Sequence, residues 1–271
     1  FEHHITGCVA FAAWNYYCVT QDKEWLKEKG WPILSATADF WASRVERNGP
    51  GHYDIKNVVG ADEWAENVDN NSFTNGVAKV NLQNATAAAK LLGIKPNADW
   101  ALVAQNIPIE KFPDGVTREY TNYEGVKIKQ ADANLLAYPL RVITDANQVK
   151  KDLAYYETRV PRVATPAMTQ AIFALLYARL GDTEKAHHFF RDAYEPNVLP
   201  PFRVLAETKG GNNPYFATGA GGVLQSLLMG FGGLDITPAG IVQLKSKLPA
   251  AWKSLKITGV GPERKTYVVG K

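Results

Sequence analysis

The sequence predicts a fold dominated by α-helices, with a small β segment at its end. Two patterns lead to this prediction. Apolar residues recur at three- and four-residue steps through most of the first 230 residues, which is typical of helices with one buried face. After Gly232-Gly233 the pattern changes to short alternating segments with turn residues between them, which favours strands.

The first helix-period segment lies at the N-terminus. There Ile5, Val9, Ala12, Tyr16 and Val19 describe one amphipathic face. Further helices are predicted at residues 23–46, 72–92, 131–142, 146–157, 165–181, 183–193 and 218–230.

Three long polar loops join these helices, at residues 47–71, 106–130 and 195–217. Loops of this length in a compact domain are usually functional or disordered, and these are rich in Trp, Tyr, Phe, Asn and Glu. Several helices that carry such loops indicate a toroid of helical hairpins with a site at one end.

Strand patterns occur in two places. Residues 111–130 contain the strand-like stretch "VTREYTNYEGVKIKQ", and residues 233–271 alternate in short segments. We therefore expect a helical region at residues 1–232, incomplete at its N-terminus, and a β segment at residues 233–271.

Composition and charge exclude several classes of protein. The 271 residues are 46% hydrophobic and carry a net charge of only +3, which argues against a nucleic-acid or membrane-surface partner. No apolar run approaches the roughly 20 residues of a membrane span. Cys8 and Cys18 lie about 15 Å apart on one predicted helix, too far for a disulfide, so we interpret both as small core residues.

No Cys/His cluster has metal-ligand spacing, and we expect neither a metal nor an organic cofactor. The chain begins with Phe1 and not Met, which suggests a piece of a longer polypeptide and leaves the compartment open. A periplasmic or extracellular location is slightly favoured.

The stretch "VGADEWAENVDNN", residues 59–71, concentrates acidic side chains. Asp62, Glu63, Glu66 and Asp69 lie within eight positions, with no Lys or Arg between Lys56 and Lys79. Crowded carboxylates raise one another's proton affinity, which suits a general acid. The alternative is a solvated turn whose last residues cap a helix that begins near Phe73.

A second acidic candidate, Glu207, lies in the loop "LPPFRVLAETKGGNNPYFATGAGG". Two carboxyl groups in aromatic loops are what glycoside hydrolysis requires: one donates a proton to the leaving oxygen, and the other activates water or attacks directly. With 27 acidic residues in the chain, the pair alone is a weak signal.

Several blocks of the sequence resemble glycoside hydrolase family 65. "VVGADEWAENVDNNSFTN" is similar to the family's acidic signature, "KIKQAD" to its K-Q-A-D block, and "TGAGGVLQSLLMGFGGL" to its glycine-rich closing helix. "LPAAWKSLKITG" resembles the start of its C-terminal β-domain. The blocks occur in family order over essentially the whole chain.

The resemblance implies an (α/α)6 barrel that acts on α-linked glucosides with inversion. It assigns the general acid to Glu63, with Glu66 as an alternative three residues away. It places Lys129 and Gln130 on the cleaved glucosyl unit, although Lys129 could instead pair with Asp132. It also implies an upstream β-sandwich and further barrel helices, so the missing N-terminal part of the same enzyme is an expected partner.

The family contains hydrolases and phosphorylases. A carboxylate on the side of the nucleophile would repel phosphate by about 4 kcal/mol for unit charges 4 Å apart at an effective dielectric near 20. Glu207 occupies that position, and "NNPYFATGAGG" lacks the phosphorylases' His-x-x-Ser pattern, so we interpret Glu207 as the base of a hydrolase. A phosphorylase and a non-catalytic carbohydrate-binding protein remain alternatives.

Trp64 and Tyr215 are candidates for stacking on sugar rings, although Trp64 could belong to the core and Tyr215 could merely support its loop. The phrases "PPFRVLAE" and "NNPYFATGAGGVLQ" look most like bacterial enzymes that act on α-1,2-linked glucosides such as kojibiose. Trehalose and glucosyl-galactosyl units are alternative substrates. Glucose is the expected product.

Overall fold

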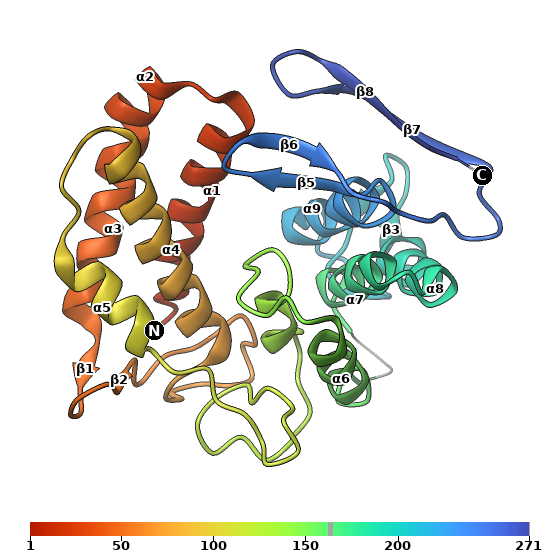
Figure 1. The fold of residues 1–271 in the computed structure, drawn as a ribbon. Coiled ribbons are helices and arrows are strands. Elements are labelled where there is room, and N and C mark those ends of the chain that lie inside the picture. The colour runs from red at the N-terminus through yellow and green to blue at the C-terminus, as the bar shows by residue number, and fades with distance from the viewer. Residues whose placement is uncertain (162–164, 271) are drawn as a thin grey trace. The chain divides into compact units, whose positions relative to one another are not determined.

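A computed structural model describes residues 1–161 and 165–270, which form two compact units. Unit 1 comprises Phe1–Gly125, Leu135–Thr144 and Thr237–Gly240. Unit 2 comprises Val126–Asn134, Asp145–Ile236 and Ile241–Lys271. Helices dominate both units, as the sequence predicts (Figure 1).

Unit 1 is built on helices of the N-terminal half. They are α1 (His4–Thr20), α2 (Lys23–Trp25), the π-helical turn η1 (Leu26–Gly30), α3 (Trp31–Arg44), α4 (Ser72–Leu91) and α5 (Ala98–Asn106). Helices α1, α3 and α4 pack against one another. Gly7 permits the close approach of α1 to α4, because a Cβ atom there would lie 2.8 Å from Cγ1 of Val77.

The predicted helix at residues 23–46 is confirmed as the run α2–η1–α3, which ends at Arg44 where the short strand β1 (Glu46–Arg47) follows. Strand β1 pairs antiparallel with β2 (Tyr53–Asp54). Helix α5 was not predicted. Its signal is Asn97, whose side chain accepts from Asp99 N (3.0 Å) as an N-cap before the buried Trp100 and Val103.

The predicted face of the first helix is not the buried one. Ile5, Val9 and Tyr16 are exposed. Helix α1 buries its opposite side instead, through His4, Gly7, Ala10, Ala13, Trp14, Tyr17 and Cys18. Both sides of the helix are apolar, so periodicity could not distinguish the face that packs within unit 1.

Unit 2 contains the helices of the C-terminal half. They are α6 (Ala146–Glu157), α7 (Ala167–Leu180), α8 (Thr183–Tyr194), the 3-10 turn η3 (Glu195–Asn197), α9 (Ala217–Gln225) and the π-helical turn η4 (Ser226–Phe231). All four α-helices were predicted. Strands β3 (Val198–Leu199) and β4 (Val204–Leu205) form a small antiparallel pair before α9.

Small residues let α9 and η4 lie close to α7. A Cβ atom on Gly222 would lie 2.8 Å from Cβ of Ala171, and one on Gly230 would lie 3.2 Å from Cβ of Ala178. Between them, Ser226 Oγ donates to Ala171 O at 2.9 Å. The residue numbers at these contacts rise together in both segments, from Gly222 and Ala171 to Gly230 and Ala178. The two segments therefore run parallel and begin at the same end of unit 2.

The predicted helix at residues 131–142 is wrong. The structure describes all of this segment, and its only helical element is the 3-10 turn η2 (Ala133–Leu136). Pro139 lacks a backbone N–H, and its ring disfavours helical geometry at the preceding residue. The carbonyl of Leu136 instead accepts from Val142 N (2.8 Å) and Ile143 N (3.1 Å).

The strand expected within residues 111–130 is also wrong. Among the described residues of this segment, the only bridge joins Lys111 to Thr117. Two of its backbone N–H groups bond to loops: Thr121 N donates to Asp69 O (2.9 Å), and Ile128 N donates to Arg159 O (3.3 Å). The segment runs from unit 1 into unit 2 and therefore lacks one continuous strand partner.

The C-terminal part forms two hairpins, as its strand pattern predicts. Strand β5 (Leu234–Thr237) pairs with β6 (Gly240–Gln243), and β7 (Ser254–Val260) pairs with β8 (Lys265–Gly270). The division into a catalytic region and a β segment at residues 232 and 233 stays a prediction. Within residues 1–161 and 165–270, no helix combines the length and the apolar character needed to cross a membrane.

Candidate active site

The acidic loop, residues 59–71, belongs to unit 1 and has a fixed base. Val58 and Val68 form an antiparallel bridge with two N–O distances of 2.9 Å. The Val58 side chain is fully buried. The bridge closes the loop that carries Asp62, Glu63 and Trp64. The base of this loop is therefore anchored in the buried core of unit 1.

Asp62 shapes the tip of the acidic loop. Its side chain is 1% exposed, its Oδ1 accepts from Trp64 N at 3.1 Å, and its carbonyl accepts from Ala65 N at 3.1 Å. Asp favours such turns because its side chain can replace a backbone acceptor two residues away. The turn leaves Glu63 exposed and Trp64 57% exposed, so Trp64 is not a core residue.

Negative charge gathers behind this turn. Burial raises the pKa of Tyr120, and the charges of Glu119 and Asp62 raise it further. Glu119 is buried like Asp62, at 1% exposed. The shift of the Tyr120 pKa thus shows that Asp62 and Glu119 both act on the Tyr120 hydroxyl.

The end of the acidic loop is the N-terminus of α4, as predicted. Asn71 Oδ1 accepts from Thr74 N at 2.8 Å and so caps the helix. Gly60 lies against this cap, because a Cβ atom on Gly60 would lie 2.3 Å from Asn71 Nδ2. Only glycine lets the start of the loop cross the capping side chain without a shift.

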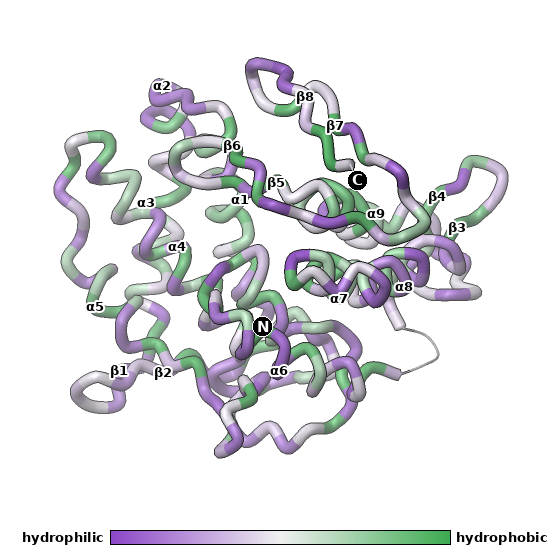
Figure 2. Tube along the Cα trace, turned by 45° about the vertical axis from the view of Figure 1, so that its right-hand side comes forward, coloured by the Kyte–Doolittle hydropathy of each residue, from purple (hydrophilic) through white to green (hydrophobic). Residues whose placement is uncertain are grey.

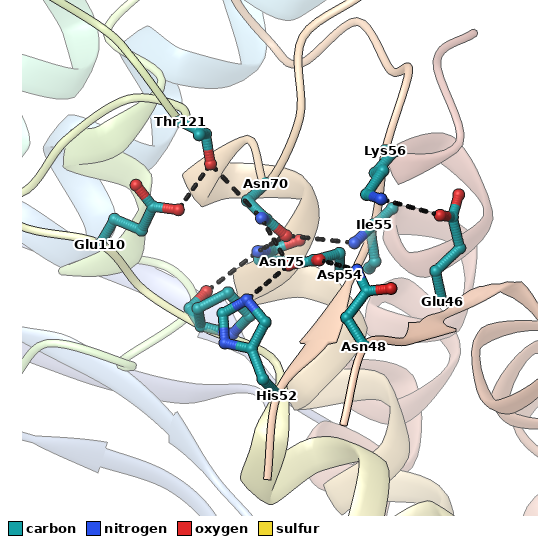
Figure 3. A network of polar contacts seen from close by, with 11 residues as sticks. Glu46, Asn48, His52, Asp54, Ile55, Lys56, Asn70, Asn75, Glu110 and Thr121 are labelled. Atoms are coloured by element: carbon teal, nitrogen blue, oxygen red, sulfur yellow. Dashed lines mark hydrogen bonds and ion pairs between the residues drawn. The ribbon is translucent and has the colours of Figure 1, made fainter. Parts of the chain in front are cut away.

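Asn70, near the end of the acidic loop, is the centre of a polar network (Figure 3). Its backbone has a φ of 50°, which Asn tolerates better than most residues. Its Nδ2 donates to Asp54 Oδ1 (2.8 Å), and its Oδ1 accepts from Ile55 N (3.1 Å) and Asn75 Nδ2 (3.3 Å). One buried amide thus joins β2, the acidic loop and α4.

Asp54 is the acid of this network. Burial alone would raise the pKa of Asp54, but hydrogen bonds from Asn70 and Asn48 and the charges of His52 and Lys56 together lower it. His52 Nε2 lies 2.8 Å from Asp54 Oδ1. The network therefore holds Asp54 as an ionised carboxylate. Its oxygen atoms accept hydrogen bonds that stabilise the fold, so we assign Asp54 no catalytic role.

His4 ties α1 to the start of the acidic loop. Its Nδ1 lies 3.1 Å from Val59 O, and Val59 N donates to Phe1 O at 3.1 Å. Burial is the main reason that the pKa of His4 is lowered. The neutral imidazole therefore donates its Nδ1–H to the loop carbonyl.

Glu207 belongs to unit 2, where it meets Lys129. Its Oε1 lies 3.1 Å from Lys129 Nζ, and both side chains are about one quarter exposed, at 28% and 23%. This ion pair requires an ionised carboxylate, which is the protonation state of a general base. The sequence predicted both residues as site residues but did not predict that they would pair with each other.

The first turn of α7 holds both members of the pair. Ala167 N donates to Glu207 O at 2.7 Å, and Thr169 Oγ1 donates to Lys129 O at 3.0 Å. Glu207 is therefore fixed through its backbone and its side chain to the same helix end.

Gln130 follows Lys129 but is buried, at 4% exposed. Asp132 and Asn134, at 0% and 2% exposed, continue a buried polar run. Asp132 N donates to Gln130 O at 2.9 Å. Of the K-Q-A-D block, Lys129 is thus the residue that reaches a partly open position beside Glu207.

The loop that carries Glu207 also displays aromatic side chains. Tyr215 is 74% exposed and has a φ of 64°, while the next residue, Phe216, donates its N–H to Leu205 O at 2.9 Å. Phe202, which was not predicted, is 81% exposed in the same loop. Its place after Pro200-Pro201 is a signal that could have found it, because prolines favour turns and the loops that contain turns run over the surface.

A separate cavity of about 790 Å³ lies in unit 2. Its lining includes Lys127, Gln170, Phe173 and Asp192 but neither Glu207 nor Lys129. We therefore assign it no catalytic role. In the part of the chain that the structure describes, no three His, Cys, Asp or Glu side chains are grouped so as to hold a metal ion.

The site residues thus form two groups, each inside one unit. Unit 1 places Glu63 beside Trp64 on a rigid turn, with Glu66 also exposed on the same loop. Unit 2 joins Glu207 to Lys129 and displays Tyr215. The exposed position of Glu66 leaves it an alternative to Glu63.

Comparisons with known proteins agree with the sequence blocks. The pattern that describes the glycosyl hydrolase family 65 central catalytic domain matches residues 1–125 and 114–199. A kojibiose hydrolase of Mucilaginibacter mallensis is 75% identical over 269 residues, which are 99% of this chain and 40% of that protein. A kojibiose hydrolase of Flavobacterium johnsoniae is 64% identical over 270 residues, again 99% of this chain and 40% of that protein.

A solved structure from the human microbiome, assigned provisionally as a kojibiose phosphorylase, has the same fold. Its TM-score is 0.76 at 16% identity, and the match covers 98% of this chain and 42% of that chain. The chain thus spans about 40% of the length of the curated relatives it matches.

Proposed function

This chain belongs to glycosyl hydrolase family 65, and from that membership we propose that its enzyme hydrolyses an α-linked glucosyl disaccharide with inversion. Kojibiose, an α-1,2-linked glucoside, is the favoured substrate, because two kojibiose hydrolases are similar to nearly the whole chain. Glucose released in the β form is the expected product.

The ion pair of Glu207 and Lys129 is the observation that most supports hydrolysis over phosphorolysis. A phosphate nucleophile on this side would have to displace the carboxylate from the ammonium and then remain beside a negative charge. Water meets no such barrier and gains a hydrogen-bond acceptor that can take its proton.

The proposed mechanism uses two carboxyl groups, those of Glu63 and Glu207. Glu63 donates a proton to the glycosidic oxygen as the bond to the anomeric carbon breaks. Glu207 takes a proton from a water molecule that attacks the opposite face of the ring. An inverting mechanism needs about 6.5–9.5 Å between the two carboxyl groups, which a crystal structure with a bound sugar would measure.

Substrate binding is assigned to residues around these two carboxyl groups. Lys129 donates to sugar hydroxyls while it keeps Glu207 in place, and Gln130 supports the glucosyl unit from its buried position. Trp64 and Tyr215 offer exposed aromatic faces, on which sugar rings stack. We further propose that the helices belong to an (α/α)6 barrel.

The test is a product assay on the enzyme that contains these residues. Kojibiose, trehalose and nigerose are incubated with and without inorganic phosphate, and glucose and glucose 1-phosphate are measured. Free glucose from kojibiose, independent of phosphate, supports the proposal. Glucose 1-phosphate would instead identify a phosphorylase, and sugar affinity without turnover would identify a binding protein.

The Glu207→Gln variant tests the role of the base. The amide is nearly the same size but cannot accept the proton from water, so we expect kcat to fall by at least about 10³-fold while kojibiose still binds. Wild-type kcat in this variant would contradict the assignment. The 271-residue chain is assayed beside an enzyme of full length, which shows whether the remainder of the polypeptide is required.

A further inference from the structure

A small cavity in unit 2 lies where the end of α7 meets the chain that follows β6. Its volume is about 70 Å³, and its lining includes Arg179 of α7, Gly233 after η4, and Lys245 and Ser246 after β6. One water molecule takes up about 30 Å³ in the liquid, so the space has room for about two particles of that size. The cavity is therefore large enough for a small ligand and too small for a sugar.

Ser246 contributes a polar group that has no partner in this cavity. Its Oγ atom is shielded from solvent and has no hydrogen-bond partner among the described residues. Gly233 lets the side chain lie close to the backbone, because a Cβ atom on Gly233 would lie 3.1 Å from Ser246 Oγ. An unpaired buried hydroxyl costs free energy, so native proteins normally pair such a group with a water molecule or an ion.

The charges around the cavity favour an anion as this partner. The cations Arg179 and Lys245 line it, and none of the described residues of its lining is acidic. Arg179 Nη1 donates to Met229 O at 3.2 Å and lies 3.5 Å from Asp235 Oδ1, so one carboxylate offsets part of this charge. Two cations and one nearby carboxylate leave a net positive charge, which disfavours a cation.

The neighbouring sequence adds to the positive charge. Between Asp235 and Glu263 the chain carries four lysines and no acidic residue, and all four lysines are exposed. The hydropathy of this segment, which leads from β6 to β7, can be followed along the tube in Figure 2. A local excess of positive charge raises the concentration of small anions beside the cavity.

We propose that this cavity binds a small inorganic anion of the size of chloride. The anion accepts hydrogen bonds from the hydroxyl of Ser246 and the ammonium group of Lys245, and the charge of Arg179 attracts it. Hydrogen bonds between ionised partners are stronger than neutral ones. The bound anion joins the end of α7 to the segment after β6 and so stabilises unit 2. This inference does not depend on the proposed reaction.

Thermal unfolding in exchanged anions tests the proposal. The enzyme that contains these residues is unfolded at a fixed sodium concentration while gluconate, which is too large for the cavity, is replaced by chloride. A ligand that binds only the folded state stabilises it. We therefore expect Tm to rise by about 2 °C or more between 0 and about 200 mM chloride.

Two substitutions remove contacts of the anion. Ser246→Ala deletes the hydroxyl donor, and Lys245→Gln deletes one charge while it keeps a polar side chain. Each should lose at least about half of the chloride-dependent rise in Tm. Lys247→Gln is the matched control and should keep the full rise, because Lys247 is an exposed lysine of the same segment that does not line the cavity.

Bromide identifies the occupant directly. A crystal of the same enzyme, soaked in sodium bromide and measured at the bromine absorption edge, should show an anomalous peak beside Ser246 Oγ. A water molecule there without such a peak would overturn the proposal, as would a chloride-dependent rise in Tm that Ser246→Ala and Lys245→Gln keep in full. Neither measurement uses a substrate, so a failure of the catalytic proposal would not affect them.

Discussion

At the scale of single residues, the two candidate catalytic carboxyl groups are held in different ways. Glu63 stands on a turn whose buried member, Asp62, bonds to the backbone N–H of Trp64. Glu207 is held by an ion pair and by the first turn of α7. The first arrangement places Glu63 on an exposed turn, and the second fixes an ionised group.

Lys129 offers a test of the second arrangement. Lys129→Ala removes the charge that orients Glu207 at 3.1 Å, so we expect kcat/KM for kojibiose to fall on the order of 10²-fold. Lys127→Ala is the control, because Lys127 Nζ donates to Thr158 O and not to Glu207. Steady-state kinetics, with circular dichroism to verify folding, make the comparison. Equal loss in both variants would refute a specific role for Lys129.

His4 predicts a pH dependence of stability. The pKa of His4 is lowered in the folded protein, chiefly by burial, so the unfolded chain binds the proton more readily. The free energy of unfolding should therefore decrease as pH falls below about 6.5, the unfolded value, towards the folded pKa.

The variant His4→Asn keeps a side-chain N–H donor for Val59 O but does not titrate. Denaturant unfolding at several pH values should show a smaller decrease below about pH 6.5 in this variant; His3, whose pKa is also lowered, retains its part. An unchanged slope in His4→Asn would show that His4 is not the group responsible.

At the scale of elements, the glycine-rich helix α9 is placed by close packing on α7. Gly221 and Gly222 are neighbours with opposite surroundings: a Cβ atom on Gly221 meets nothing within 4 Å, while one on Gly222 lies 2.8 Å from Cβ of Ala171. The sequence shows two adjacent glycines, and only the packing distinguishes their roles.

This pair gives a matched prediction. Gly221→Ala should raise the free energy of unfolding by up to about 1 kcal/mol, because Ala favours a helix over Gly. Gly222→Ala should lower it by about 1–3 kcal/mol, because α9 must move away from α7. Chemical denaturation of both variants tests the difference, and the same sign for both would show that the close contact is absent.

At the scale of the whole molecule, the proposed inverting mechanism requires Glu63 and Glu207 to act on one sugar. The stereochemistry of the product tests this requirement. Proton NMR during the first minutes of kojibiose hydrolysis should show β-glucose in excess of its equilibrium share, because the reducing-end glucose is released as a mixture of anomers and the cleaved glucosyl unit only as β. An early excess of α-glucose would indicate retention, which needs a shorter separation of about 5–5.5 Å and a nucleophilic carboxylate.

Local signals in the sequence predicted most of the helices correctly. The Asn71 cap of α4 and the apolar periods of α6, α7 and α8 depend on neighbours a few residues away. Two predictions failed for different reasons. Residues 116–130 resemble a strand, but their backbone bonds to residues that are distant in the sequence. Residues 131–142 resemble a helix by their apolar period, but Pro139, a local signal in the sequence itself, interrupts it.

By itself, the sequence determined the family, the helical class and the identities of Glu63, Glu207, Lys129 and Gln130 as candidates, because motif order and residue chemistry are written along the chain. Only the tertiary structure decided that Lys129 pairs with Glu207, that Trp64 is exposed, and that α1 leaves Ile5 and Val9 uncovered. Burial and ion pairing arise between residues far apart in sequence, so no local pattern can specify them.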